Sequence, residues 1–588
     1  MKYTLRDINE SFTELDTEDF EFIQKMKNTL SVYVEGYKFD PRFKIGVWDG
    51  KKHFWKIHNE KLYFTKGLVQ YILDDLEEQN IPYTYDKISE NYPITEEELK
   101  KFIKSLDIPF EPYDYQFSAV LASIKEKRLV LRSSTSSGKS LIIYIVLRYL
   151  HSKGFNSVLV VPSINLVDQM YTDFIDYGWN DIYKFVKQIG GEHKSSKELS
   201  EKPIIISTWQ SLMRISKEEF EIFDCIIVDE CHSAKGDVLN SIITNSINCS
   251  WKLGLTGTVP RKMEDKLMLL GALGRVETVI TPGQLIQRGL ATPIEIKSIF
   301  LRYSDSDCRN FKRNKLDYHK EVKYIEEHYY RNNKVANIVN KIGITGNTLG
   351  MFSHISHGEY LLKMIIGLRA GIEGSVEYLN KPTPKKILEM YKRLKKEDFT
   401  LFVSNRMELK EFKKHLKNIL KEYPEEETEI VDFLEGIKDT YSYDIFFIVG
   451  EVKGSEREII RSRLEEIHPK EIGRGAIILG NYGVVSTGVN YKNLHNIVYL
   501  SSLKAYTKIV QSIGRGMRLH KSKDKVNIYD MIDVLKEGKE VYHCNYSLRH
   551  FYDRFEYYMD DEYDVVEVDI KLKGDSLRQE FDEYSKEW

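Results

Sequence analysis

The chain has 588 residues, of which 42% are hydrophobic and 30% are charged, a composition that excludes a largely disordered protein. At about 150 residues per domain, the length allows roughly four domains. The formal net charge of −3 means that any nucleic-acid surface must be local. No apolar run reaches the ~18 residues of a membrane span, and no signal peptide is recognisable. We therefore expect a cytoplasmic protein without a membrane partner, in the host cytoplasm if the source is viral.

Cysteine usage argues against metal and disulfide frameworks. The five cysteines contain no C-x-x-C pair, so neither zinc nor a set of structural disulfides is expected.

Residues 31–70 differ from their acidic flanks. They carry eight Lys and Arg against four Asp and Glu, interleaved with aromatic residues. Cations neutralise phosphates and aromatic rings stack on bases, so the pattern predicts a DNA-binding surface that includes Arg42, Lys44 and Trp48. A small β-rich core with an ordinary lysine fringe explains the same pattern, and both interpretations stay open. Further on, Thr95 followed by Glu98 predicts a helix N-terminus.

From Tyr113 onward, apolar Val- and Ile-rich runs alternate with helical segments, which predicts a doubly wound parallel sheet. Within this series, residues 128–140 read as a strand, a phosphate loop and a helix. In such a loop Lys139 reaches the β- and γ-phosphates of ATP, and the Ser140 hydroxyl holds Mg²⁺. The predicted nucleotide-binding residues of the loop are Ser133, Ser134, Thr135, Ser136, Ser137, Gly138, Lys139 and Ser140. A helix-opening turn without ligand would explain the Gly-Lys-Ser tripeptide alone.

Asp229 and Glu230 follow the apolar run CIIV, 90 residues after Lys139. Ligands of parallel sheets bind at the carboxyl ends of the strands, so both carboxylates are expected beside the phosphate loop. Asp229 is the predicted Mg²⁺ ligand, and Glu230 is the predicted base that orients the attacking water. An acidic turn without function is the alternative. The hydroxyl-rich turn Thr256-Gly257-Thr258 follows the next strand and is a candidate sensor of the phosphates.

These motifs occur in a diagnostic order. SSTSSGKS, VPSINLVDQ (161–169), ISTWQSL (206–212), DECH and TGT resemble motifs I, Ia, Ic, II and III of superfamily 2 helicases. The resemblance implies that Gln116 contacts adenine and that His232, Thr256 and Thr258 couple hydrolysis to movement. Ser133 and Ser136 stand where the family's motif I often has Ala and Gly, which leaves the loop conformation open.

The second half of the chain continues the resemblance. Residues 287–303 look like a hinge into a second domain, and a helical stretch over about 316–341 follows. Residues 351–361 resemble motif IV, although 399–416 are a second candidate for it. His354 and His357 lack a third ligand, so a metal site is disfavoured. NYGVVSTGVN (481–490) resembles motif V with Thr487 and Gly488, and QSIGRGMR (511–518) matches motif VI.

Motif VI contributes three predicted catalytic residues, Gln511, Arg515 and Arg518. The two arginines are three positions apart, so they lie on one side of a helix and can face a nucleotide. A guanidinium near the γ-phosphate stabilises transition-state charge. A basic surface helix is the alternative interpretation.

Further stretches, among them GYKFDPRFKIGVWDG, QIGGEHKSSK, SHISHG and YGVVSTG, resemble the UvsW-type DNA helicases of tailed bacteriophages. The resemblance covers the chain except for an insertion at about 362–440 and a tail after about 550. It implies a small α/β N-terminal DNA-binding domain (1–108) and two tandem RecA-like doubly wound parallel-sheet domains (109–293 and 294–588). It also implies ATP and Mg²⁺ as cofactors. The expected strand contacts, made mainly through phosphates, are Ser163, Gly190, Gly191, Thr208, His354 and Thr487.

The implied function is an ATP-dependent helicase with 3′–5′ polarity that acts on single-stranded and branched DNA in recombination, replication and repair. Its expected substrates include forks, Holliday junctions and the RNA–DNA hybrids of R-loops. We expect a monomer that meets other replication and recombination proteins. An RNA helicase, a nucleotide-gated annealing scaffold and a double-strand translocase without strand separation remain alternatives.

Overall fold

The computed structural model describes most of the chain, in two compact units, 1–281 and 282–588. The described residues are 2–190, 201–213, 217–233, 242, 245–314, 317–369, 445–450, 454–467, 469, 475–485, 491–502, 509, 512–514, 516–535 and 544–572. None of the helices in these ranges is long and apolar enough to cross a membrane.

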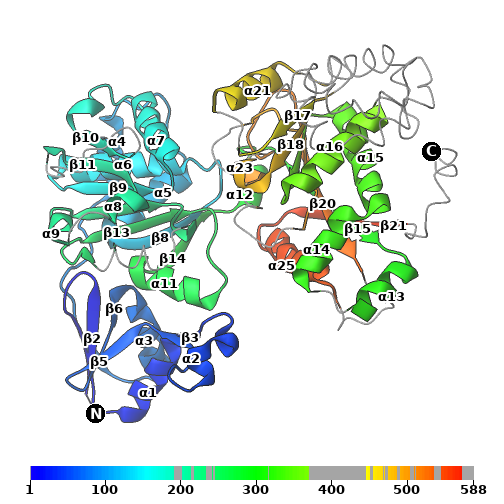
Figure 1. The fold of residues 1–588 in the computed structure, drawn as a ribbon. Coiled ribbons are helices and arrows are strands. Elements are labelled where there is room, and N and C mark those ends of the chain that lie inside the picture. Colours follow the sequence, from blue (N-terminus) through cyan, green and yellow to red (C-terminus); the bar gives the residue numbers. More distant parts are fainter. Residues whose placement is uncertain are drawn as a thin grey trace, which may run out of the picture. The chain divides into compact units, whose positions relative to one another are not determined.

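The first unit begins with a small α/β domain built on a five-stranded sheet of order β5-β6-β2-β1-β7 (Figure 1). Its sheet strands are β1 (Tyr3–Asp7), β2 (Phe12–Asp16), β5 (Trp55–His58), β6 (Lys61–Thr65) and β7 (Tyr83–Asp86). A separate ribbon pairs β3 (Ser31–Tyr33) with β4 (Lys51–His53). The helices are α1 (Phe20–Thr29), η1 (Tyr37–Phe39), α2 (Pro41–Lys44), η2 (Lys66–Leu68) and α3 (Val69–Glu78). Helix α4 (Glu96–Lys104) follows and packs through Leu99 in the core of the large sheet.

A parallel seven-stranded sheet of order β10-β11-β9-β12-β13-β8-β14 forms the rest of this unit. Its strands are β8 (Arg128–Ser133), β9 (Ser157–Val161), β10 (Val186–Ile189), β11 (Ile204–Thr208), β12 (Cys225–Asp229), β13 (Trp251–Thr256) and β14 (Val276–Ile280). The helices are α5 (Asp114–Glu126), α6 (Lys139–Ser152), α7 (Ile164–Asp176), η3 (Ile182–Lys184), α8 (Trp209–Leu212), α9 (Lys217–Phe220), η5 (Cys231–Ser233) and α11 (Met263–Leu273).

Both faces of this sheet are buried. Alternate strand residues such as Leu131 and Ile227 join one hydrophobic core with α5 and α6, while their neighbours Val130 and Ile226 join another with α8 and α11. A parallel sheet covered on both faces has near-continuous apolar strands, which is why these runs are visible in the sequence.

The second unit repeats this architecture with a sheet of order β17-β18-β16-β19-β20-β15-β21, also parallel throughout. Its strands are β15 (Ile294–Arg302), β16 (Thr348–Phe352), β17 (Ile445–Ile448), β18 (Ile477–Asn481), β19 (Asn496–Tyr499), β20 (Val526–Val534) and β21 (Asp564–Lys571). The helices are α12 (Pro282–Gln287), α13 (Asp305–Asn314), α14 (Tyr318–Glu327), α15 (Tyr329–Thr345), α16 (Ile355–Arg369), α21 (Gly454–Glu466), α23 (Tyr482–Val485) and α25 (Tyr546–Asp560).

The two large sheets have the same topology. If the strands of each are counted along the chain, β8 corresponds to β15, β9 to β16, β12 to β19 and β13 to β20, and the spatial order is identical. The predicted fold class, two doubly wound parallel-sheet domains after a small α/β domain, is therefore confirmed.

Helix α11 belongs to two cores of the first unit. Its residues Leu267 and Leu270 pack among the buried side chains of the small domain, while Leu269 and Leu273 pack against the large sheet. Gly67 approaches the Leu270 carbonyl so closely that a Cβ at this position would overlap the backbone. Nearby, the Lys252 ammonium in the buried strand β13 donates to Ser11 Oγ at 2.7 Å. The small domain is thus packed firmly onto the first large sheet.

Other local expectations are met or refined. Thr95 caps α4 by accepting from the Glu98 N–H. The helical stretch expected over 316–341 is two helices, because the His328 imidazole accepts from the Arg331 N–H and starts a new helix. The first motif IV candidate (351–361) spans the end of β16, an inner strand of the sheet, and the start of α16. The second candidate (399–416) and most of the expected insertion lie outside the described residues. The predicted domain limits stay a prediction.

Candidate nucleotide site and nucleic-acid interface

The phosphate loop connects β8 to α6. Ser136 and Gly138 both have positive φ values, 69° and 80°, and helix α6 begins at Lys139. Ser136 therefore takes the left-handed conformation that glycine adopts most easily. The Ser133 and Ser137 hydroxyls lie 2.6 Å apart and close the loop on itself. Serine at positions 133 and 136, where motif I often has Ala and Gly, is therefore compatible with a phosphate-loop conformation.

Lys139 and Glu230 form the ionic centre of the site. They meet because β12 and β8 flank β13, whose end at Gly257 has no side chain to separate them. Lys139 Nζ lies 3.2 Å from Glu230 Oε1. Burial opposes the ammonium charge, but Glu230 and Asp229 outweigh it and raise the pKa of Lys139. Burial likewise opposes charge on Glu230, yet Lys139 and then His232 lower its pKa. Both groups are therefore charged at neutral pH.

Asp229 is buried beside this pair, and the charge of Lys139 offsets only part of the cost of ionising it. Burial first, and then the charge of Glu230, raises the pKa of Asp229. Among the buried side-chain atoms of the described residues, Asp229 Oδ1 has no hydrogen-bond partner. A buried carboxylate oxygen without a partner is costly unless a ligand or cation completes it, so this site fits a divalent cation.

Ser140, the second predicted Mg²⁺ ligand, is the second residue of α6. Its hydroxyl lies 2.7 Å from the Tyr177 hydroxyl. Hydroxyl oxygens and carboxylates are the ligands that Mg²⁺ prefers, so Ser140 and Asp229 are the residues that would hold it.

The three predicted coupling residues come together at the ends of β12 and β13. His232 Nδ1 lies 2.6 Å from Thr256 Oγ1 and 3.3 Å from Glu230 Oε2. The Thr256 hydroxyl donates to the Thr258 carbonyl, and the Thr258 N–H donates back to it. Gly257 N–H hydrogen-bonds the Glu230 carboxylate. Glu230 is therefore connected to this turn through both Gly257 and His232.

Gln116 contacts the chain's own backbone. Its amide nitrogen donates to the Ser137 carbonyl at 2.8 Å, and its amide oxygen accepts from the Tyr113 N–H at 2.9 Å. The Tyr115 hydroxyl also donates to the Ser137 carbonyl. Gln116 thus supports the phosphate loop in this structure, and its predicted adenine contact stays a prediction.

Three expected strand contacts gather at the carboxyl ends of β9, β10 and β11. Gly190 has a φ of 141°, and a Cβ there would touch Thr208, Ser211 and Ile164. Ser163 is exposed and precedes α7 directly. Thr208 Oγ1 lies 3.1 Å from the Ser211 hydroxyl. Small residues and hydroxyls beside a backbone with this conformation suit close approach to a phosphate chain.

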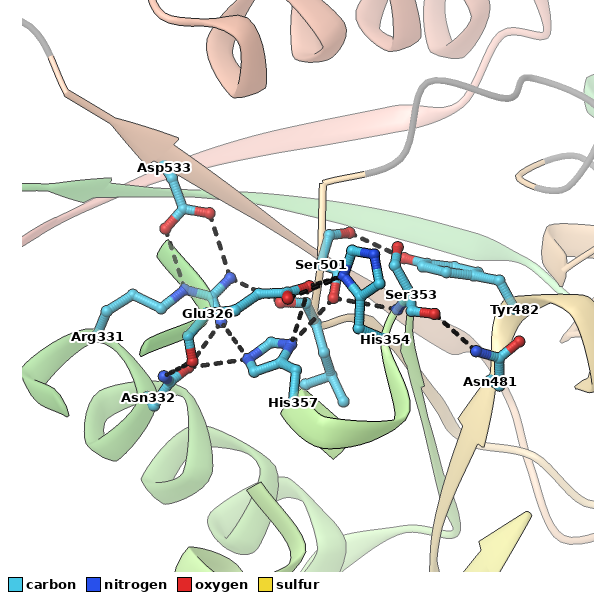
Figure 2. Close-up of polar contacts among 11 residues, drawn as sticks. Glu326, Arg331, Asn332, Ser353, His354, His357, Asn481, Tyr482, Ser501 and Asp533 are labelled. Atoms are coloured by element: carbon cyan, nitrogen blue, oxygen red, sulfur yellow. Dashed lines mark hydrogen bonds and ion pairs between the residues drawn. The ribbon is translucent and has the colours of Figure 1, made fainter. Parts of the chain in front are cut away.

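The two histidines of motif IV have opposite environments (Figure 2). His354 is exposed, and its Nδ1 lies 2.9 Å from the Glu326 carboxylate. His357 is buried, with Nε2 3.0 Å from Asn332 Oδ1 and Nδ1 3.1 Å from Ser501 Oγ. No group of three or more His, Cys, Asp or Glu that could hold a metal occurs among the described residues. His357 is thus a structural residue, and only His354 is accessible to a nucleic acid.

A buried ion pair anchors this region of the second unit. Arg331 Nε donates to Asp533 Oδ1 at 3.0 Å, and Arg331 also donates to the Leu500 carbonyl. Asn481 donates to the Ser353 carbonyl, and Tyr482 donates to the Ser501 carbonyl. Figure 2 shows these side chains converging on the loop that carries His354.

Other predicted site residues cannot be placed. Gly191, Thr487, Gly488, Gln511 and Arg515 lie outside the described residues. The backbone carbonyl of Arg518 accepts from the Thr292 hydroxyl, which ties the end of motif VI to the start of β15.

The two predicted DNA-binding cations of the small domain, Arg42 and Lys44, are exposed. Arg42 forms an ion pair with Asp40 at 2.9 Å, and its guanidinium stands 5.0 Å from the Trp48 ring centroid. The Trp48 indole donates to the Lys51 carbonyl. Lys44 is exposed at the end of α2.

Comparison with known proteins found family models that match the small domain and the domain that carries Lys139, Asp229 and Glu230. The family model "DNA helicase UvsW, N-terminal" matches residues 2–81, and "Type III restriction enzyme, res subunit" matches residues 108–261. The ATP-dependent DNA helicase uvsW of Enterobacteria phage T4 is 28% identical over 579 residues, which cover 96% of this chain and 98% of that protein. Over nearly its whole length, the chain is thus similar to a UvsW-type helicase.

Other similar proteins are more distant or cover less of the chain. Putative helicase 22 of Sulfolobus islandicus filamentous virus is 26% identical over 254 residues, covering 40% of this chain and 44% of that protein. A crystal structure of T4 UvsW is 26% identical, covers 97% of this chain and 100% of its own, and has a TM-score of 0.44. A second one from bacteriophage T4 is 28% identical, covers 47% and 100%, and also has a TM-score of 0.44.

Three residues that contact predicted site residues were not identified from the sequence. Tyr177 contacts Ser140, Gly257 contacts Glu230, and Glu326 contacts His354. Gly257 lies inside the TGT motif and could have been found there. Tyr177 and Glu326 follow no motif, because each reaches its partner through tertiary packing alone.

Proposed function

We propose that this chain hydrolyses ATP to drive movement along DNA and thereby unwinds or remodels branched molecules such as forks, Holliday junctions and R-loops. The observation that carries the proposal is the convergence of Lys139, Glu230 and Asp229, with Asp229 Oδ1 lacking a partner among the described residues. Three charged groups on two neighbouring loops suit the phosphates of a nucleotide and its cation.

Each residue has a distinct role in the proposed hydrolysis. Lys139 neutralises the β- and γ-phosphates, and Asp229 with Ser140 holds Mg²⁺, which supplies charge neutralisation at the phosphates. Glu230 orients the attacking water and accepts its proton, for which its lowered pKa keeps it ionised. Arg515 and Arg518 of motif VI supply positive charge to the γ-phosphate.

The contact from Glu230 through His232 to Thr256 supports a route from hydrolysis to movement. Bound phosphates compete with Glu230 for Lys139, so when the γ-phosphate leaves, the Lys139–Glu230 ion pair can re-form and the turn at Thr256–Thr258 can change with it. The exposed Ser163, with Gly190 and Thr208 beside it, would hold the strand by its backbone, as a sequence-independent motor requires.

The proposal that the substrate is DNA is supported by the similarity to the T4 helicase. The T4 relative is named an ATP-dependent DNA helicase, and the chain matches it over nearly its whole length. We accordingly propose DNA as the track, 3′–5′ polarity, and a role in recombination-dependent replication and repair.

The test is ATP hydrolysis by the purified chain alone, with single-stranded DNA, with RNA and with forked DNA. Stimulation by DNA, strongest on the fork, supports the proposal. Stimulation by RNA alone moves the protein to the RNA helicases, and hydrolysis that no nucleic acid stimulates favours an annealing scaffold. DNA affinity should fall by about 10³–10⁵ between 50 and 200 mM salt if 6–10 phosphates are contacted.

Glu230→Gln separates binding from chemistry. The amide keeps the size of the side chain but cannot accept the proton, so we expect ATP turnover to fall by about 10²–10⁴ while ATP and DNA stay bound. Glu219→Gln, an exposed carboxyl in the same unit, is the matched control. A Glu230→Gln enzyme with normal turnover would show that another group activates the water.

A further inference from the structure

Tyr177 follows the last residue of α7 and reaches the predicted cation site on α6. Its hydroxyl oxygen lies 2.7 Å from the hydroxyl oxygen of Ser140, the second residue of α6. The two helices pack beside each other in the first unit (Figure 1). Tyr177 lies outside all the recognised motifs, so its contact with a predicted Mg²⁺ ligand needs a physical explanation.

The backbone around Tyr177 is fixed by the way in which α7 ends. The Gly178 N–H donates to the Ile175 carbonyl at 2.9 Å, and the Trp179 N–H donates to the Phe174 carbonyl at 3.1 Å. These two bonds, with a glycine at a φ of 96°, make a Schellman motif. Trp179 is buried and stacks against Phe174, which is the hydrophobic contact that often accompanies this motif. Packing within the protein therefore sets the position of Tyr177.

The ring of Tyr177 packs against the face of α6 that carries Ser140. Tyr144 is four positions after Ser140, and residues four apart lie on one face of a helix. The Tyr177 ring contacts the buried Tyr144 ring with centroids 5.4 Å apart, and Phe110 meets it edge-on at 5.9 Å. Because two aromatic contacts hold the ring, its hydroxyl is directed to Ser140 with little freedom.

The Ser140 hydroxyl has one proton and two lone pairs, and a cation can use only the lone pairs. Its proton must therefore point away from the cation and toward an acceptor. The Tyr177 oxygen is at hydrogen-bond distance from Ser140, and Tyr177 is half-buried. Tyr177 can thus accept the Ser140 proton while its own proton goes to solvent.

The other predicted Mg²⁺ ligand shows what this contact prevents. Asp229 Oδ1 is buried and has no hydrogen-bond partner within the described ranges. Two ligands of one Mg²⁺ lie about 3 Å apart, since each is about 2.1 Å from the ion, so Ser140 could donate to this oxygen. Such a bond would occupy both ligands, and the cation would have to break it. In the structure Ser140 is bonded to Tyr177 instead, which leaves the Asp229 oxygen available.

We propose that Tyr177 is a positioning residue for the Mg²⁺ site, because it accepts the Ser140 proton and so directs a Ser140 lone pair to the cation. This inference rests on the proposed ATP hydrolysis and adds to it a residue that acts through Ser140. Residues that orient metal ligands typically contribute about 10–100-fold to metal affinity. Tyr177 therefore sets the Mg²⁺ concentration that the site needs and leaves the chemical step at saturating Mg²⁺ unchanged.

The test compares the full-length chain with Tyr177→Phe, which removes one oxygen and keeps the ring contacts with Tyr144 and Phe110. Tyr171→Phe is the matched control, because Tyr171 is a half-buried tyrosine on α7. The first readout is the Mg²⁺ dependence with which a fluorescent non-hydrolysable ATP analogue binds. The second is the Mg²⁺ dependence of DNA-stimulated ATP hydrolysis, and denaturant unfolding checks that the fold is intact.

We expect Tyr177→Phe to raise the Mg²⁺ concentration for half-maximal binding of the analogue at least about tenfold. Binding in EDTA and hydrolysis at saturating Mg²⁺ should stay within about twofold of wild type, because neither depends on how the cation is captured. Tyr171→Phe should match wild type in every measurement. In a Ser140→Ala background, Tyr177→Phe should add no further shift, because its effect passes through Ser140.

The outcomes separate this proposal from the function beneath it. A wild type that binds the analogue with Mg²⁺ but hydrolyses no ATP with DNA removes the proposed function, and the binding readout still decides the role of Tyr177. A wild type that does both, with a Tyr177→Phe variant of unchanged Mg²⁺ dependence, removes only the role of Tyr177.

Two further results would also overturn it. An equal loss of binding with and without Mg²⁺ would mean that Tyr177 supports the nucleotide or the fold and not the cation. A further shift in the Ser140→Ala background would mean that Tyr177 does not act through Ser140.

Discussion

The two seven-stranded sheets share one topology but use the same edge in opposite ways. In the first, the loops after β8, β12 and β13 bring together Lys139, Glu230 and Asp229, and buried polar atoms of Asp229, His232 and Thr258 have no partner among the described residues. In the second, the ends of β19 and β20 are occupied by Leu500, Ser501 and Asp533, and a buried arginine satisfies the carboxylate.

The two sheets differ in whether the polar groups at this edge are hydrogen-bonded within the protein. The carboxylate pair after β12 has no equivalent after β19, where the chain continues as Leu500-Ser501. A buried polar group without a partner is unfavourable, so it persists where a ligand completes it, whereas a fully bonded network rigidifies the fold. The first edge is therefore arranged for a ligand, whereas the described part of the second edge carries a bonded structural network with His354 at its exposed margin.

Lys139→Ala gives the largest expected effect at the first edge. The phosphates lose their buried positive charge, so we expect DNA-stimulated ATP hydrolysis to fall by at least about 10³. Circular dichroism should report an unchanged fold. Hydrolysis at the wild-type rate would remove the assignment of this edge as the nucleotide site.

Asp533→Ala tests the second edge. It leaves the buried Arg331 guanidinium without its counter-charge, so the free energy of unfolding should fall by about 3–5 kcal/mol. Denaturant unfolding measures this, and binding of a fluorescent ATP analogue to the first unit should persist. Asp524→Ala, at an exposed position of the same unit, should change stability by no more than about 0.5 kcal/mol. A loss of nucleotide binding with little loss of stability would reverse the roles of the two edges.

Asp229→Asn should raise the free energy of unfolding, whereas Asp533→Ala lowers it. Burial raises the pKa of Asp229 to about 7, so the ionised form destabilises the fold at higher pH. Without nucleotide or divalent cation, the variant should be more stable than wild type by about 1 kcal/mol at pH 8, although hydrolysis is lost. Because the unfolded carboxyl titrates near pH 4 (about 3.9 for Asp), wild type should lose stability relative to the variant as pH rises from 5 to 7. A pH-independent difference would contradict this.

Ser136→Gly has the smallest expected effect. Ser136 adopts a φ of 69°, which costs a non-glycine residue about 1 kcal/mol. Glycine should recover a similar amount in denaturant unfolding while hydrolysis stays within about threefold of wild type. Gly138→Ser is the reciprocal change and should be harmful, because a Cβ at Gly138 would overlap the Gln116 amide. A destabilised Ser136→Gly would mean that the serine side chain holds the loop.

The sequence predicted the buried parallel strands well, because a strand covered on both faces is a continuous apolar run. It did not predict β10, β14 and β21, and it assigned residues 287–303, which contain β15, to a hinge. These lie at or next to the sheet margins, and β21 is mostly exposed, so VETVI and DVVEVDIK lack that signal. Lys139, Asp229 and Glu230 were identifiable because the chemistry fixes both residue type and position. Tyr177 and Glu326 were not, since a hydroxyl or carboxylate at many positions could serve equally well.

Helix α11 serves two hydrophobic cores at once, and this makes the small domain inseparable from its neighbour. Deleting residues 1–90 would uncover Leu267 and Leu270 and strip Lys252 of its contact with Ser11. A truncated chain would then be damaged for reasons unrelated to DNA. Any substitution in α11 affects the packing of both cores, so the two parts must change together during evolution. Exchanging the small domain between relatives therefore requires the exchange of α11 with it.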